Sequence, residues 1–264
     1  MTRGMKRHIL ALAATALYMI VAAYPAPADL SLDVAPAKIE VPVTPGTVQT
    51  VPITVRNTGT GPMHIQTSIV DYAVTQSGDY VFGRPGTGRY SLGAWATINP
   101  REFDVAPNSF QLVRMTINVP QGISGEYSGI AFFQTRPLRH TGGGIVFSER
   151  VASKIYLYSG NTVRINGNVD DIAVKETNIG ERFLIGFKNT GNAHLYLNGN
   201  IQIRKGADMV QRIPLQQQML VERGGRRIIE AFSQKLPPGQ YTALALIDFG
   251  GPNLAGGQTS FTVK

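Results

Sequence analysis

Residues 55–59 read Val-Arg-Asn-Thr-Gly and residues 187–191 read Phe-Lys-Asn-Thr-Gly, so the chain carries one short stretch twice. Each copy ends a run in which apolar and polar residues alternate, the pattern of a half-buried β-strand. Asn and Gly then favour a turn, because both tolerate positive φ and the Asn side chain can bond the backbone ahead of it. A Gly-x-Tyr follows each copy, at residues 125–127 and 239–241. The repetition predicts two β-sandwich domains in tandem.

Short strands separated by turn signals roughly every 8–12 residues are typical of immunoglobulin-like sandwiches. In such domains a tyrosine near a late strand ties a crossover loop to the backbone, and each Gly-x-Tyr fits that place. The expected fold is all-β, with tandem immunoglobulin-like domains at 29–158 and 159–264 behind a signal segment at 1–28. The first domain carries about 18 extra residues, assigned to 83–95. Pro36 indicates an edge position or a switch between sheets.

The first 28 residues have the composition of an export signal. Three basic residues lie among the first seven, residues 9–23 are apolar and uncharged, and residues 26–28 read Ala-Pro-Ala, a cleavage pattern. The apolar run is shorter than the roughly 20 residues of a membrane span. We therefore expect cleavage and a periplasmic or secreted protein of the cell envelope without a stable membrane span. An uncleaved N-terminal anchor is the alternative.

The composition excludes several classes of function. The chain has no cysteine, which rules out disulfides, thiol catalysis and zinc sites of the cysteine type. Residues 159–264 carry 12 Lys or Arg against 8 Asp or Glu. This surplus favours an anionic partner or serves solubility alone. No basic run with interleaved aromatic residues is present, so no nucleic acid is expected as a partner.

No catalytic motif is recognisable, whether a Gly-x-Ser-x-Gly elbow or a His-Glu-x-x-His helix. His64 and His194 each follow one of the repeated turns, where imidazoles are expected to face water, and they fall in different domains. We therefore expect no metal, no cofactor and no enzymatic activity. The single tryptophan, Trp95, is either a surface aromatic that contacts sugar or a core anchor beneath a loop.

A set of motifs in residues 30–158 follows a recognisable order. It comprises Pro-Ala-Lys-Ile at 36–39, Asn-Thr-Gly at 57–59, Gln-Leu-Val-Arg-Met at 111–115, Glu-Tyr at 126–127 leading to Phe132, and Lys-Ile-Tyr-Leu-Tyr at 154–158. In this order the motifs resemble the periplasmic pilus-assembly chaperones, the PapD-like family. Residues 159–264 resemble that family in architecture only.

In that family a basic pair in the cleft between the domains holds the C-terminal carboxylate of a subunit, and the last strand of the first domain completes the subunit's fold by strand addition. The resemblance therefore implies an exported, pilin-like protein subunit as partner. Lys38 takes the first basic position. The second falls on Tyr156, while Lys154 lies two residues earlier on the same strand face. The expected partner-binding residues are Lys38, Lys154, Ile155, Tyr156 and Leu157.

A second likeness leads to another function. Residues 95–107, the strand after them, Val119-Pro120 and the first Gly-x-Tyr resemble the N-terminal module of the WxL-interacting cell-surface proteins. This resemblance implies a structural or adhesive envelope module that binds peptidoglycan or another cell-wall glycan, with Trp95 as a contact. A chaperone for pilus or surface-structure assembly is the favoured hypothesis, and the cell-wall module is the alternative.

Overall fold

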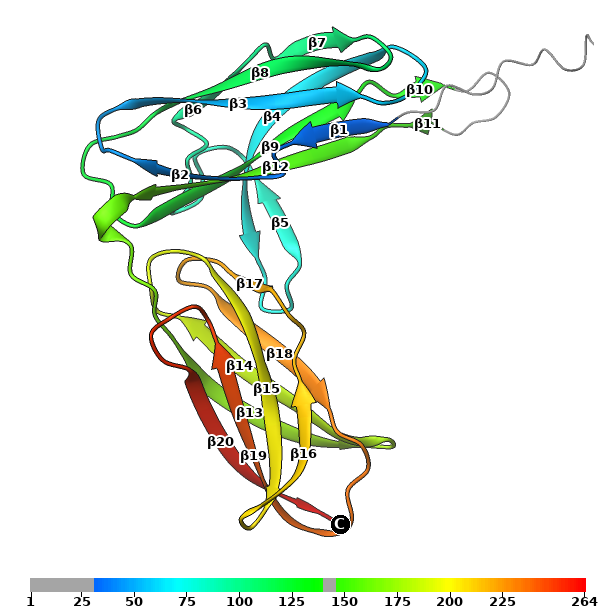
Figure 1. Ribbon diagram of the computed structural model, residues 1–264, viewed down its shortest axis with the longest axis vertical. Helices are drawn as coiled ribbons and strands as arrows, with labels where there is room; N and C mark the ends of the chain where they lie inside the picture. Colours follow the sequence, from blue (N-terminus) through cyan, green and yellow to red (C-terminus); the bar gives the residue numbers. More distant parts are fainter. Residues whose placement is uncertain (1–30, 140–145) are drawn as a thin grey trace, which may run out of the picture.

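The computed structural model describes residues 31–139 and 146–264, and the predicted signal segment lies outside this part of the chain. The described residues form strands and one short 3-10 helix, η1 (Gly160–Thr162). None of them belongs to a helix that could cross a bilayer. Figure 1 shows two sandwiches that meet at an angle. The predicted all-β fold of two immunoglobulin-like domains is confirmed.

The first sandwich consists of two facing sheets. One has the order β1-β3-β8-β6, from β1 (Leu32–Ala35), β3 (Val48–Asn57), β8 (Ser109–Asn118) and β6 (Ala96–Asn99). The other has the order β2-β12-β9-β4-β5, from β2 (Lys38–Val43), β12 (Arg150–Ser159), β9 (Glu126–Thr135), β4 (Met63–Val74) and β5 (Tyr80–Gly83), with β7 (Glu102–Val105) also on β4. A small hairpin pairs β10 (Leu138–Arg139) with β11 (Val146–Phe147).

Alternation along the strands decides which face each sheet buries. Ile53 and Val55 of β3 and Val113 and Met115 of β8 are fully buried and point into one shared core. The polar residues between them face solvent, as period-two patterning requires. Pro36 lies between β1 and β2, which belong to different sheets. It therefore marks a switch between the sheets.

The second sandwich follows η1 and has its own core. Its smaller sheet has the order β13-β14-β18, from β13 (Gly167–Thr177), β14 (Gly180–Asn189) and β18 (Arg226–Phe232). The larger has the order β16-β15-β19-β20, from β16 (Asp208–Pro214), β15 (Leu195–Lys205), β19 (Gly239–Asp248) and β20 (Ala255–Val263), with β17 (Met219–Val221) also on β15.

The repeated asparagine makes equivalent side-chain hydrogen bonds in both domains. Asn57 is fully buried, and its amide donates to the carbonyls of Gly61 (2.8 Å) and Val105 (3.0 Å) while its oxygen accepts from the Gly59 N–H. Asn189 repeats this arrangement, with its amide 2.8 Å from the Ala193 carbonyl. Each asparagine thus closes its own turn and ties it to a distant strand end.

The two Gly-x-Tyr sequences differ in structure. The Tyr241 hydroxyl donates to the Pro237 carbonyl (2.7 Å), which is the bond of a tyrosine corner. Tyr127 instead packs its ring against Trp95, with the ring centres 4.7 Å apart. The predicted corner is therefore present in the second domain and replaced by aromatic packing in the first.

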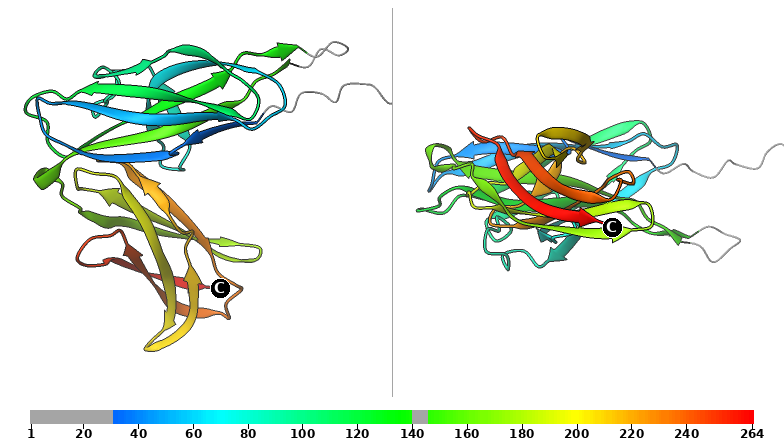
Figure 2. Two further views of the ribbon diagram at one scale, coloured as in Figure 1. Left: turned by 45° about the horizontal axis from the view of Figure 1, so that its top comes forward. Right: turned by 90° about the horizontal axis from the view of Figure 1, so that it is seen from below.

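Two of the contacts between the domains lie at opposite sides of their interface. Near η1, Gly125 has φ +71°, and a Cβ there would lie 2.6 Å from the Asn192 carbonyl oxygen, so this close approach requires glycine. On the other side, the hairpin of β4 and β5 reaches across to the second domain, as both views show (Figures 1 and 2). At its tip the Gln76 carbonyl accepts a hydrogen bond from the Ile228 N–H of the edge strand β18 (2.8 Å). These contacts leave a cleft between the domains.

The cleft between the domains as candidate functional site

The floor of the cleft is formed by β2 and β12, which run parallel with Lys154 opposite Lys38 and Tyr156 opposite Glu40. Directly opposed residues of a parallel pair project from the same face, so the structure brings the two predicted lysines together. The Lys38 ammonium lies 2.8 Å from the Glu40 carboxylate, and this hydrogen bond raises the pKa of Lys38. It also lies 5.2 Å from the ring centre of Tyr196 in the second domain.

The Lys154 ammonium is surrounded by tyrosines. It donates to the Tyr80 hydroxyl (2.5 Å) and lies 4.6 Å from the centre of that ring. The rings of Tyr72 and Tyr156 are 5.3 and 5.8 Å away. Within the described residues no carboxylate lies at ion-pair distance from this ammonium. Its charge is therefore oriented by π faces and one hydroxyl.

Tyr156 is fully buried at the domain interface, where its ring stacks on His194 of the second domain at 3.9 Å between centres. Its hydroxyl donates to Glu222 Oε1 (3.4 Å), and the Tyr72 hydroxyl donates to the same oxygen (2.8 Å). Burial raises the pKa of the Glu222 carboxyl and those of both tyrosines. The PapD-like chaperones that the sequence resembles have a basic residue at the position of Tyr156. Here Tyr156 instead takes part in a buried network of hydroxyl and carboxyl groups.

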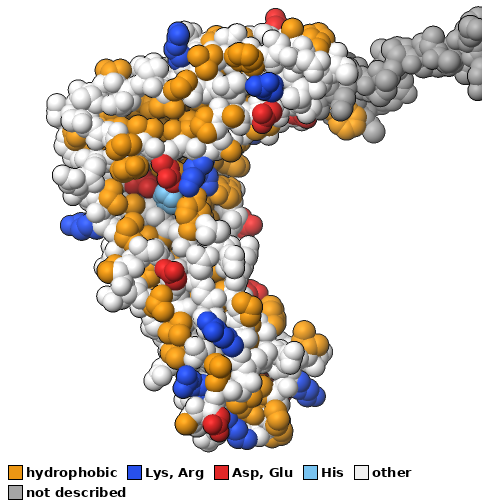
Figure 3. Space-filling model, viewed as in Figure 1, with side chains coloured by type: hydrophobic (Ala, Val, Ile, Leu, Met, Phe, Trp, Pro, Cys, Tyr) orange, Lys and Arg blue, Asp and Glu red, His pale blue; other side chains and the backbone are white. Residues whose placement is uncertain are grey.

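His194 lies inside this interface, so the prediction that it faces water is wrong. Its Nδ1 is 2.6 Å from the buried Glu126 carboxylate, its backbone N–H donates to the other Glu126 oxygen (3.1 Å), and Nε2 is 3.7 Å from Glu40. Figure 3 shows a histidine with charged side chains of both signs at the bend between the domains. His64 lies elsewhere, on β4. Its pKa is raised mainly by a hydrogen bond to Glu102 and secondly by one to Asp104.

The other predicted site residues point away from the cleft. Ile155 and Leu157 are fully buried in the core of the first domain, because they alternate with Lys154 and Tyr156 along β12. Neither side chain is exposed to a partner. Trp95 is half-buried and packs against the same core. This packing is what a core anchor requires.

The first part of β12 has a partner strand on one side only. β9 pairs with β12 from Arg150 onward, whereas β2 pairs with it from Lys154 onward. The Lys154 N–H donates to the Ala37 carbonyl, on the side away from β9 (2.8 Å). Residues two apart on a strand direct their backbone groups the same way. Ala152 therefore points its N–H and C=O toward a side on which the described chain places no partner strand.

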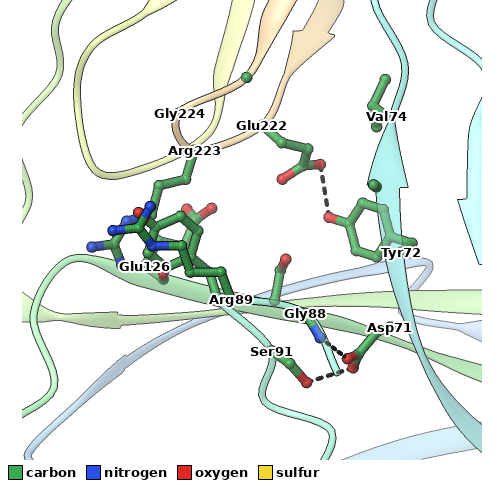
Figure 4. Close-up of a pocket in the computed structure, with 14 residues that line it drawn as sticks. Asp71, Tyr72, Val74, Gly88, Arg89, Ser91, Glu126, Glu222, Arg223 and Gly224 are labelled. Carbon is green, nitrogen blue, oxygen red and sulfur yellow. Dashed lines mark hydrogen bonds between the residues drawn. The ribbon is translucent and has the colours of Figure 1, made fainter. Parts of the chain in front are cut away.

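A pocket of about 300 Å³ opens beside this network, between β4 and the turn at residues 222–225 (Figure 4). The strands on either side of this turn, β17 and β18, pair with strands of different sheets. The turn thereby carries Glu222 and Arg223 to the first domain, a placement that no local pattern reveals.

Comparisons with known proteins agree with this architecture. No protein-family model matches the chain, and no curated protein matches it in sequence. A structure described as a chaperone–tip adhesin complex of CFA/I fimbriae biogenesis aligns with 87% of this chain and 98% of its own, at 11% identity and a TM-score of 0.51. The CupB2 chaperone of Pseudomonas aeruginosa aligns with 88% of this chain and 100% of its own, at 12% identity and a TM-score of 0.48.

The SafB chaperone, solved with the SafA pilin of Salmonella enterica, aligns with 90% of this chain and 99% of its own at 14% identity and a TM-score of 0.47. These three neighbours are described as chaperones or as chaperone complexes. At 11% identity, the likeness to the chaperone–tip adhesin complex shows a shared fold alone.

Proposed function

We propose that the protein is an exported, non-enzymatic chaperone that binds a pilin-like protein subunit by β-strand edge pairing, for pilus or surface-structure assembly. The observation that carries this proposal is the strand pairing of β12. Its first residues, Arg150–Ser153, have one partner strand, and the strand then enters the cleft beside the lysine pair. A partner strand added at that side would gain main-chain hydrogen bonds, as in other strand-addition complexes.

The lysines supply the polar end of such a site. Lys38 and Lys154 stand directly opposite each other, and Lys154 has aromatic and hydroxyl neighbours in place of an acid. A carboxylate at the partner's chain end would complete the ion pair that Lys154 lacks. Tyr156 forms the buried floor beneath them. Ile155 and Leu157 hold β12 against the core, so their part is to fix the strand on which the lysines sit.

The strand-addition step is tested at Ala152. Because the Ala152 N–H is directed away from β9, Ala152→Pro removes one donor from the free side while leaving the β9 ladder in place. We expect this variant to lose co-purification with an exported, pilin-like subunit that binds the wild-type protein, when both are co-expressed. Ala152→Val, which keeps the N–H, is the matched control.

Thermal melting of both variants shows whether the first domain is still folded. Equal recovery of the subunit with wild-type protein and with a folded Ala152→Pro variant would remove the basis for edge pairing. Retention on purified peptidoglycan, lost on Trp95→Ala with the fold intact, would support the cell-wall module instead.

A further inference from the structure

The pocket beside the cleft is lined from both domains. Asp71, Tyr72 and residues 88–91 come from the first domain, and residues 222–225 from the second. Figure 4 shows Arg89 and Arg223 toward one end of the pocket and Glu222 with Tyr72 toward the other. The pocket is separate from the lysine pair, since neither lysine lines it.

The two arginines share one aromatic ring. The Arg223 guanidinium lies 3.8 Å from the ring centre of Tyr90, and that of Arg89 lies 5.4 Å from the same centre. Arg223 also donates through Nη1 to the carbonyls of Ser124 (2.9 Å) and Glu126 (2.8 Å). In residues 31–139 and 146–264 no carboxylate forms an ion pair with either guanidinium. Two like charges thus face one cavity without a counter-ion.

The acids that line the pocket do not fill that role. Asp71 is buried, and its oxygens accept from the Gly88 N–H (2.7 Å) and the Ser91 hydroxyl (2.5 Å). The Glu126 carboxylate is bonded to the imidazole and backbone N–H of His194. Glu222 lies at the opposite end with the tyrosines. Within the described residues, none of the three carboxylates that line the pocket is thus an ion-pair partner of Arg89 or Arg223.

We propose that this pocket binds a carboxylate between Arg89 and Arg223, as an anion site distinct from Lys38 and Lys154. The planar guanidinium fork suits a carboxylate, which it can hold by two parallel hydrogen bonds. Such a ligand would also offset the repulsion between the two arginines. The carboxylate belongs to an acidic side chain, a peptide chain end or a free small acid, and these sources share one recognition chemistry.

Calorimetric titration of the whole protein at constant ionic strength tests the site with three probes. These are succinate, the capped peptide acetyl-Gly-Asp-Gly-amide and the peptide acetyl-Gly-Gly-Gly with a free carboxylate; neutral succinamide is the control ligand. We expect saturable binding of at least one carboxylate and none of succinamide. The tightest of the three identifies the source.

Arg89→Gln decides the assignment, because Arg89 is exposed and its loss disturbs no core contact. We expect it to weaken binding about tenfold or more, as loss of a charge-assisted hydrogen bond predicts. Arg84→Gln, an equal charge change in the same loop but away from the pocket, is expected to bind as wild type. Absence of saturable binding, or an Arg89→Gln variant that binds as tightly as wild type, would overturn the proposal. Neither result depends on strand addition, so the proposed function is tested separately.

Discussion

Asn57 and Asn189 can be compared directly, because they occupy equivalent turns in the two domains. Both are fully buried and bonded alike, but Asn189 also holds the carbonyl of Glu222 (3.0 Å), the residue that enters the cleft. Asn57 holds a strand end remote from the cleft, at Val105. The same side chain therefore stabilises the fold in one domain and both the fold and the site in the other.

We expect Asn57→Ala and Asn189→Ala each to lower the free energy of unfolding by about 1–3 kcal/mol, because buried carbonyls lose their donor. Denaturant titration measures this. Only Asn189→Ala is expected to weaken carboxylate binding in the pocket as well. Similar binding losses in both variants would show that the turns affect the cleft through general stability alone.

Glu222 introduces a pH dependence. Its ordinary pKa of 4.5 is raised by burial in the folded protein, so the folded state holds this proton more tightly than the unfolded chain. The resulting stabilisation is fully present below pH 4.5 and is lost as pH rises through the raised pKa. We expect Glu222→Gln to raise the melting temperature at pH 7.5, by about 2–4 °C for each kcal/mol gained.

The gain from Glu222→Gln should shrink as the pH is lowered toward 4.5, which calorimetry between pH 4.5 and 8 can follow. Asp208→Asn, at an exposed position of β16, is the control with an equal change of charge. A pH-independent effect of Glu222→Gln would contradict the role assigned to this carboxyl.

Among the strands, those that depend on local patterning could be predicted. The alternation at the end of β3 and along β14 sets which residues are buried, and the Asn-Thr-Gly turns close as their chemistry requires. The place of Glu222 could not be predicted in this way. It depends on β17 and β18 belonging to different sheets and on the angle at which the domains meet, and both are set by contacts distant in sequence. Lys38 and Lys154 are predicted partner-binding residues because the family resemblance points to them.

The hairpin of β4 and β5 is the element that spans the gap between the domains. Its tip residue Gln76 accepts the Ile228 N–H with its backbone and the Arg226 guanidinium with its side chain (3.0 Å). Arg226 in turn pairs with Asp170 (2.8 Å), which lowers the pKa of that carboxyl. The hairpin therefore caps the edge strand β18 of the second domain.

We expect replacement of residues 75–79 by a two-residue Asn-Gly turn to leave both sandwiches folded but to free their relative orientation. The radius of gyration from small-angle X-ray scattering should increase and its distance distribution should broaden. Gln76→Ala removes one side-chain bond and keeps the backbone bond, so it should change the scattering little. Identical scattering from the shortened hairpin and wild type would show that the contacts around Gly125 fix the orientation alone.

The described part of the molecule is two sandwiches joined at both ends of their interface, at the turn around Gly125 and at the hairpin tip. Each has its own core, and between these ends the buried Tyr156 and Glu126 of the first domain contact His194 of the second. Separation of the domains would expose this polar network to water and lose its stacking. We therefore expect a single calorimetric unfolding transition for the described sandwiches, with Tyr156→Ala splitting it into two.

The contact between the tip of the β4–β5 hairpin and β18, at the open side of the cleft, has a kinetic consequence. With Gln76 bonded to β18, the walls of the cleft are set before a ligand arrives, and little conformational entropy remains to be lost on binding. Association should then proceed at the rate of oriented diffusional encounter, and substitutions in the cleft should alter how long a complex survives more than how quickly it forms.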